Sequence, residues 1–177
     1  MKTAVVYESM FGNTRTVAEA VAEGLGGQDV RVVRVSDVQG DDLGDVELLI
    51  VGGPTHAWSM SRRSSRKSAA TQAAEPHRHL TLEPGATDRG LREWLNDLAP
   101  HGVRAAAFDT RMDKPRFLTG AASKSICRGL RRNGCPLVVR PESFLVTKDS
   151  RLLPGEIARA RDWATQIANM HSEAQPD

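Results

Sequence analysis

The feature of this sequence that most constrains its fold is a regular alternation of apolar, strand-like runs with amphipathic helical patterns. Parallel strands are joined by crossover connections, usually helices, which cover both faces of the sheet. We therefore expect an α/β domain with one parallel sheet. The strand-like runs are 2–7, 30–35, 47–52, 103–108 and 136–146, and the helical patterns are 14–25, 88–98, 120–132 and 155–171.

Proline indicates where the last predicted strand belongs. Pro136 and Pro141 lack the backbone N–H that a central strand has to donate, so this strand should lie at an edge. With right-handed crossovers, the expected fold is a doubly wound five-stranded sheet with helices on both faces and the strand order 2-1-3-4-5.

The length of the chain, 177 residues, suits one domain with a sizeable core. We expect a single domain over residues 1–172 and a disordered tail over 173–177. Residues 58–87 show no convincing periodicity, so a long loop is expected there. Loops of this length in a compact domain are usually functional or mobile.

Composition argues against several partners and compartments. The net charge is +2, so nucleic acid is not an expected partner. No run approaches the roughly 20 apolar residues of a membrane span. Cys127 and Cys135 have neither metal-site nor disulfide-framework spacing, which predicts reduced, buried thiols and a cytoplasmic protein. His77 and His79 lack an identifiable third ligand, so no metal site is expected.

The turn after the first predicted strand has the chemistry of an anion-binding loop. Gly12 permits a tight turn, and Ser9, Asn13 and Thr14 carry short polar side chains. A helix that begins near Asn13 would direct free N–H groups and the positive end of its dipole at an anion. An ordinary capped turn is the alternative, because Ser, Asn and Thr are common N-caps. The segment 9–14 matches neither GxGxxG nor GxxxxGK[ST], so a compact terminal phosphate fits better than a Mg²⁺-bound triphosphate.

Loops after the third and fourth strands should face this turn. In a doubly wound sheet, ligands bind beyond the carboxyl ends of the strands, where the first and third strands diverge. The loops expected at that edge are 9–14, 54–60 and the segment that begins with Asp109-Thr110-Arg111. A phosphorylated ligand would lie between them.

Residues 7–14, Tyr-Glu-Ser-Met-Phe-Gly-Asn-Thr, resemble the flavin-phosphate loop of the flavodoxin-like family, commonly written T/S-x-T-G-x-T. Ser9 and Thr14 match hydroxyl positions and Gly12 matches the glycine, whereas Phe11 replaces the usual hydroxyl residue. The segment 52–56, Gly-Gly-Pro-Thr-His, resembles the loop beside the isoalloxazine ring. The resemblance implies FMN as cofactor, held by Ser9, Met10, Phe11, Gly12, Asn13, Thr14, Pro54, Thr55, His56, Ala57, Trp58, Asp109, Thr110 and Arg111.

The resemblance also suggests individual roles, each with a structural alternative. Trp58 would stack on the flavin ring or pack against its own loop, and His56 would approach flavin N5 or O4 or bond within the loop. Asp109 would accept from the flavin N3–H or the ribityl hydroxyls, or cap the end of its strand. Thr110 and Arg111 would donate near the O2 edge.

The implied function is a redox flavoprotein that passes electrons between a donor and a protein or small-molecule acceptor. The flavin carries the chemistry, so no catalytic side chain is expected. Small one-electron carriers of this family tend to be strongly acidic, whereas this chain is near neutral and has a basic loop, Arg62, Arg63, Arg66 and Lys67. The alternatives are an NAD(P)H-dependent quinone reductase or protoporphyrinogen-oxidase-like enzyme, whose anionic substrate this loop would attract, and a flavin-free binding module.

Overall fold

A computed structural model describes residues 1–26, 29–39, 43–56, 58–99 and 102–173. Five parallel strands form one sheet in the order β2-β1-β3-β5-β6, and the short strand β4 pairs antiparallel with the end of β3. The strands are β1 (Thr3–Tyr7), β2 (Val30–Arg34), β3 (Leu48–His56), β4 (Ser59–Met60), β5 (Arg104–Met112) and β6 (Glu142–Val146). The predicted doubly wound order 2-1-3-4-5 is confirmed, since β5 and β6 are the fourth and fifth parallel strands.

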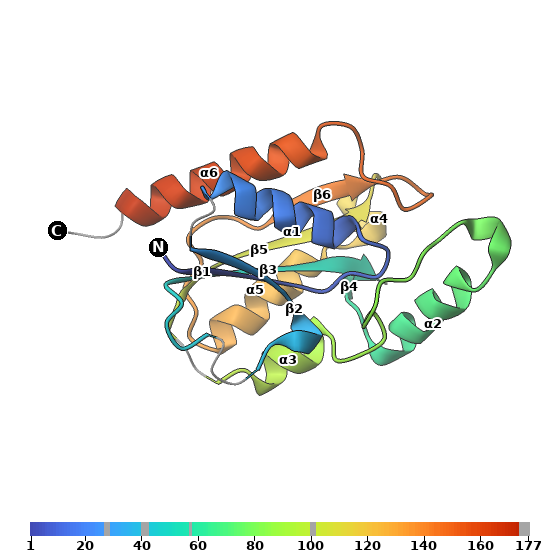
Figure 1. Cartoon of the computed structure of the whole chain (residues 1–177), viewed down its shortest axis with the longest axis horizontal. Helices are drawn as coiled ribbons and strands as arrows, with labels where there is room; N and C mark the ends of the chain where they lie inside the picture. Colours follow the sequence, from blue (N-terminus) through green and yellow to red (C-terminus); the bar gives the residue numbers. More distant parts are fainter. Residues whose placement is uncertain (27–28, 40–42, 57, 100–101, 174–177) are drawn as a thin grey trace.

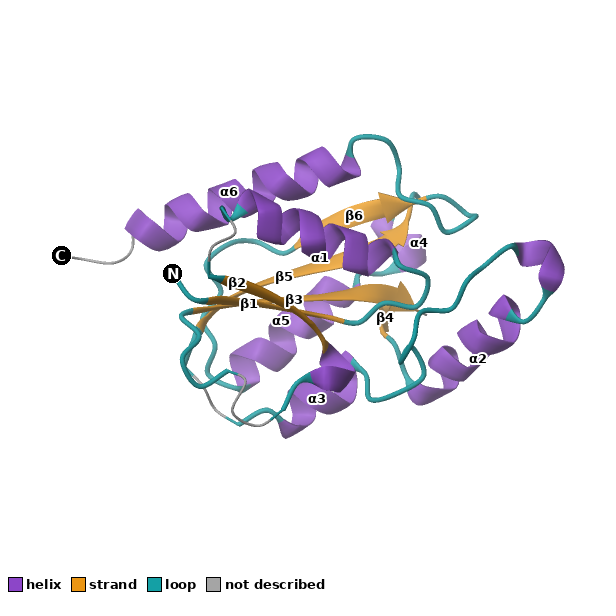
Figure 2. Cartoon of the chain, viewed as in Figure 1, coloured by secondary structure: helices purple, strands orange, loops and turns teal. Residues whose placement is uncertain are grey.

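Helices cover both faces of the sheet (Figure 1; Figure 2). On one face lie α1 (Asn13–Gly24) and α6 (Glu156–Glu173), and on the other lie α3 (Leu91–Asp97) and α5 (Ala122–Arg132). Two further helices, α2 (Arg63–Ala73) and the short α4 (Arg116–Thr119), lie near the carboxyl ends of the strands. Two 3-10 turns, η1 (Val35–Asp37) and η2 (Pro76–Arg78), complete the elements.

Alternation along the strands builds two cores. Val5 and Tyr7 of β1 pack toward α1 and α6, whereas Ala4 and Val6 pack toward α3 and α5. On the first face, three aromatic rings meet edge to face with centroids about 6 Å apart, a favoured geometry; they belong to Phe108, Phe144 and Trp163. A Cβ at Gly52 would lie 1.9 Å from the Phe108 ring, so β3 has a glycine where that ring crosses it.

The last strand is at the edge, as its prolines predict, but it is shorter than the run 136–146. β6 begins at Glu142, after both prolines, and Leu137 makes only an isolated bridge to Ala105. Pro136 and Pro141 cannot donate to a ladder, which limits regular pairing to the residues that follow them.

The expectation of a structureless loop over 58–87 is wrong, because this segment contains β4, α2 and η2. The helical pattern is hard to read in the sequence because a charged residue, Arg66, occupies a buried position of α2 beside Ala69. α6 extends to Glu173, and the rest of the predicted tail, 174–177, lies outside the described residues.

Cys127 and Cys135 are free and buried, as expected, and burial raises the pKa of both thiols. Among the described helices, none combines the length and apolar character that crossing a bilayer requires.

Candidate functional site

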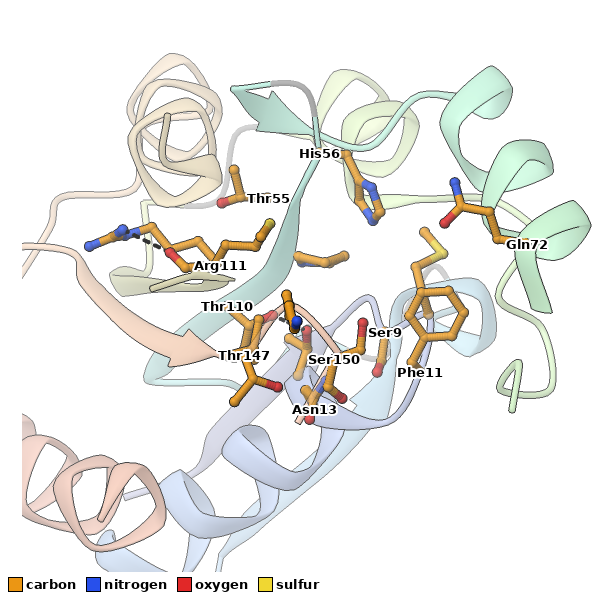
Figure 3. Close-up of a pocket in the computed structure, with 16 residues that line it drawn as sticks. Ser9, Phe11, Asn13, Thr55, His56, Gln72, Thr110, Arg111, Thr147 and Ser150 are labelled. Carbon is orange, nitrogen blue, oxygen red and sulfur yellow. Dashed lines mark hydrogen bonds between the residues drawn. The ribbon is translucent and has the colours of Figure 1, made fainter. Parts of the chain in front are cut away.

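A cavity of about 260 Å³ opens at the carboxyl ends of β1, β3 and β5 (Figure 3). This is the edge at which the sequence places the ligand loops. Ten predicted site residues line the cavity: Ser9, Met10, Phe11, Asn13, Thr14, Pro54, Thr55, His56, Thr110 and Arg111. The sheet topology therefore brings together residues that lie about a hundred positions apart in the chain.

The first loop forms an open cradle at the start of α1. Gly12 has φ +91°, a left-handed conformation that glycine adopts without strain, and its N–H donates to Ser9 Oγ at 3.1 Å. No side chain caps α1, and its first turn contains no acidic residue. The N-terminal N–H groups of the helix are thus left for an anion, which the helix dipole also favours.

Polar contacts tie this cradle to the other side of the cavity. The hydroxyls of Thr14 and Thr110 share a hydrogen bond of 2.8 Å, and the Thr14 side chain is buried. The Asn13 amide donates to the carbonyl of Ser150 at 2.8 Å, which holds the β6–α6 loop against the cradle. These two hydrogen bonds fix the first loop relative to the other side of the cavity.

A carboxylate also lies close to the cradle. Glu83 Oε1 accepts from Arg15 Nε at 2.8 Å, and Glu83 Oε2 is buried without a hydrogen-bond partner among the described residues. The Glu83 N–H donates to the carbonyl of Met10 at 2.8 Å, so this segment braces the first loop from outside. Arg15 offsets the negative charge of Glu83 beside the anion position.

His56 contributes a polar atom with no partner. Its Nε2 is buried and makes no hydrogen bond with the described residues, and the side chain lines the cavity. Burial lowers the pKa of His56, so the ring is neutral near pH 7. A buried polar atom without a partner is costly unless a ligand or water satisfies it. Figure 3 shows His56 on the same side of the cavity as Phe11 and Gln72.

A second cavity of about 380 Å³ adjoins the first and shares Thr55 and Met112 with it. Its other lining residues are Trp58, Lys114, Leu118 and Thr119. The predicted site residue Trp58 thus lies in this second cavity, with φ +68° and 65% of its surface exposed. Ala57 lies outside the described residues.

Close backbone packing fixes the width of the second cavity. Trp58 and Gly120 form a parallel bridge between the second and third loops. A Cβ at Gly120 would lie 2.3 Å from the Trp58 backbone, and Gly120 has φ +73°, so any other residue would force the loops apart. Arg111 braces the third loop, since its guanidinium donates to the carbonyls of Met112 and Lys114 at 3.2 and 2.6 Å.

Asp109 lies behind the cavity and does not line it. Its side chain is fully buried, and Oδ2 accepts from the Ser123 N–H at 2.8 Å, in the first turn of α5. Burial raises the pKa of Asp109, and the Ser123 hydrogen bond opposes that shift. Its Oδ1 is buried and has no hydrogen-bond partner among the described residues, so contact with a ligand and capping by Asp109 both stay predictions.

The four residues of the basic loop do not act together. Arg62, Arg63 and Lys67 are exposed, but Arg66 is 3% exposed and bonds to Ser61 Oγ at 3.0 Å and to Glu93 at 3.1 Å. The Ser61 hydroxyl donates to the buried Glu8 carboxylate, which also accepts from the Leu91 N–H. Arg66 is therefore part of a buried polar network rather than a free surface cation.

The sequence does not predict six residues of the first cavity. Gln72 belongs to α2, in a segment where a loop is expected, and Met112 extends the third loop. The others lie after β6, at a strand end that the same topological rule brings to this edge, and they are Val146, Thr147, Lys148 and Ser150. The position of the last strand could have predicted that loop, whereas no motif marks Gln72.

Comparison with known proteins agrees with this geometry. A family model described as "Flavodoxin domain" matches residues 4–71, which include the first loop and the second. Over 68 residues the chain is 38% identical to a flavodoxin of Aquifex aeolicus (strain VF5), an alignment that covers 34% of this chain and 37% of that protein. The chain thus matches a little over a third of the length of its curated relatives.

Solved structures are similar over the whole chain. A flavodoxin from the domain Archaea has a TM-score of 0.64 with 22% identity and covers 97% of this chain and 99% of its own. A flavodoxin, WrbA-like protein from Agrobacterium tumefaciens has a TM-score of 0.63 with 18% identity, over 98% and 99% of the two chains. At these identities the likeness establishes the fold.

Proposed function

We propose that this chain is a flavodoxin-like redox flavoprotein that carries electrons between a donor and an acceptor, because residues 4–71 match a flavodoxin family model and the fold is similar to that of flavodoxins along the chain. FMN is the cofactor of flavodoxins and occupies the edge between β1 and β3 in this fold. The observation that carries the proposal is the uncapped N-terminus of α1 in a cavity with an unpartnered His56 Nε2.

The first cavity suits the polar part of FMN. The N–H groups of the first turn of α1, with the hydroxyls of Ser9 and Thr14, would hold the phosphate. Phe11 provides no hydroxyl, so the donors of the helix terminus carry more of the phosphate contact than in relatives with three hydroxyl residues. Thr110 and Thr147 line the same cavity beyond the cradle and suit the ribityl chain.

The second cavity suits the isoalloxazine ring. It opens between Trp58 on one loop and Leu118 on the other, and both present apolar surface. Met112 and Thr55 belong to both cavities, so one elongated ligand can extend from the cradle to this gap. Neutral His56 can donate or accept toward the ring edge without adding a charge.

Bound flavin would supply the electron-transfer chemistry, and the protein would set its access and electrostatic surroundings. The residues that line the two cavities would position the flavin and exclude water from it. The free, buried Cys127 and Cys135 support the proposed cytoplasmic location, where thiols stay reduced.

An anaerobic reconstitution tests this function. Protein loaded with FMN should form a one-to-one complex with visible flavin absorption. Chemical reduction should remove this absorption, and addition of a one-electron acceptor should restore it. A complex that cannot be reoxidised by one-electron acceptors would contradict the carrier function. Protein that retains no flavin would favour a binding module.

An NAD(P)H-dependent quinone reductase is the second candidate. Exposed cations favour it, because α2, which carries Arg63 and Lys67, reaches the first cavity through Gln72, and positive charge there would attract the phosphate groups of NAD(P)H. Anaerobic mixing with NADPH, and then with a quinone, separates the two functions. Rapid flavin reduction by NADPH, followed by quinone-dependent reoxidation, would support the reductase and argue against the carrier.

A further inference from the structure

Exposed apolar side chains gather beside the second cavity. The described part of the chain has seven large apolar residues with exposed side chains, and four of them belong to the second and third loops. The exposed fractions of these four residues are 65% for Trp58, 38% for Met112, 80% for Phe117 and 54% for Leu118. Single exposed apolar residues are ordinary, but a contiguous group on one rim usually marks an interaction site.

The cofactor does not account for this group. Trp58, Met112 and Leu118 line the second cavity, whereas Phe117 lines neither cavity and projects from α4. A bound flavin would cover the cavity walls and leave Phe117 in water. A small substrate in the cavity would also leave Phe117 exposed to water. Only a larger partner would cover this side chain.

The same rim carries an excess of positive charge. Segments 58–73, 112–119 and 147–151 surround the cavities and expose seven cations, Arg62, Arg63, Lys67, Lys114, Arg116, Lys148 and Arg151. The same segments expose two acidic residues, Asp113 and Asp149. Among the described residues, Arg63, Lys67 and Arg116 form no ion pair, and Arg116 donates only to Ser143 Oγ at 3.3 Å. Figure 1 shows α2 and α4 at the same end of the sheet.

We propose that this rim, which exposes Phe117 on α4 and the cations of α2 and α4, docks a redox protein whose own docking surface is acidic. The inference rests on the proposed function, because the partner would exchange electrons with flavin at the second cavity. Aromatic residues, Met and Arg are enriched at protein interfaces, and opposite charge accelerates encounter. The cations here select an acidic surface and repel a basic one.

Binding to two defined probes tests the proposal. The FMN-loaded protein is titrated calorimetrically with an acidic two-iron ferredoxin and with basic cytochrome c. We expect ferredoxin to bind at least about 10-fold more tightly than cytochrome c at about 0.01 M salt, where the Debye length is about 30 Å. The preference should shrink at about 0.15 M salt, where that length is about 8 Å.

Three variants locate the surface. Phe117→Ser should weaken ferredoxin binding at least about 5-fold, since truncating an interface hot spot costs more than 1 kcal/mol. The triple variant Arg63→Gln, Lys67→Gln, Arg116→Gln should weaken it about 10-fold and flatten its salt dependence. The control Met170→Ser, Arg131→Gln removes one exposed apolar side chain and one exposed cation at the opposite end of the sheet, and it should leave ferredoxin binding unchanged.

The substituted residues line neither cavity, so the flavin absorption of every variant should match that of the wild type. Loss of flavin from the wild type itself would contradict the proposed function, whereas flavin retained with no ferredoxin preference would overturn only the docking surface. Binding that depends on Phe117 but appears only on vesicles with anionic phosphatidylglycerol would assign the rim to a membrane surface and overturn the protein partner.

Discussion

Thr14 carries the most specific chemistry at the scale of single residues. Its hydroxyl is buried at the cradle and shares a hydrogen bond with Thr110, so a contact within the protein fixes its position. A buried, preordered hydroxyl at a helix N-terminus costs little further entropy when it binds an anion. Thr14 should therefore contribute more to phosphate binding than the exposed residues around it.

Replacement of Thr14 by Val, which keeps the shape and removes the hydroxyl, should lower FMN affinity about 10- to 150-fold. A hydrogen bond to a charged group is worth about 1.5–3 kcal/mol, and about 1.4 kcal/mol is a factor of ten. Flavin titration of the apoprotein measures the change, with Thr165→Val on α6 as control. Equal affinities for wild type and Thr14→Val would remove Thr14 from the phosphate site.

Trp58 should report flavin binding through its fluorescence. It lines the proposed ring position, whereas Trp94 and Trp163 are 4% and 6% exposed in the two cores. FMN should quench the wild-type emission, and Trp58→Phe should abolish most of that quenching. If the quenching persists in Trp58→Phe, the ring lies elsewhere.

Site residues that belong to a local motif can be predicted best from the sequence. Ser9 and Thr14 follow from the turn chemistry, and the strand order brings Thr110 opposite them. The sequence does not separate the two interpretations of Asp109, because whether a carboxylate at a strand end faces a ligand or a helix depends on where α5 begins. That position is a property of the fold and not of the local sequence.

At the scale of elements, α2 is the helix that the sequence pattern does not predict. The helix is anchored by a buried network in which Arg66 bonds to Ser61 and Glu93, and Ser61 to Glu8. Glu8 immediately precedes the phosphate cradle, and burial raises the pKa of its carboxyl. The network therefore couples the placement of α2 to that of the first loop. A charge in a helical core position breaks the apolar period by which helices are read.

Removal of Arg66 should destabilise the protein strongly. Arg66→Met leaves Glu8 buried without its nearby cation, and breaking a buried charged network by losing one partner costs about 3–5 kcal/mol. The matched variant Arg63→Met lies on the exposed side of the same helix and should change stability by less than about 0.5 kcal/mol. Urea denaturation compares the two, and equal midpoints would show that the network contributes no stability.

At the scale of the whole molecule, the strand order could be predicted because α/β alternation and edge prolines act over the full chain. The width of the ligand edge could not, because it depends on contacts between distant loops, such as Trp58 with Gly120 and Asn13 with Ser150. No periodic pattern in the sequence predicts those contacts.

Stability should also depend on pH through His171. This side chain is 3% exposed, and neither ring nitrogen has a hydrogen-bond partner among the described residues. Burial and the nearby Arg104 lower its pKa, while Glu47 opposes them. His171 therefore binds a proton more readily in the unfolded chain than in the folded protein. The free energy of unfolding should fall as the pH drops below about 6.5.

His171→Gln should reduce this loss. Between about pH 7 and pH 5, the free energy of unfolding should fall more in the wild type than in the variant. Glu8 and Asp109, whose pKa values are raised, act in the opposite sense but are present in both proteins, so they cancel in the comparison. Parallel pH profiles from urea denaturation would contradict a buried, neutral His171.

The most direct test of the central claim is a calorimetric titration of flavin-free protein with FMN and, separately, with riboflavin. The two ligands differ only in the phosphate that the start of α1 is proposed to hold. FMN should bind one to one, and riboflavin at least about 100-fold more weakly, because two or more charge-assisted hydrogen bonds are lost. Equal affinities, or no binding of FMN, would contradict the account.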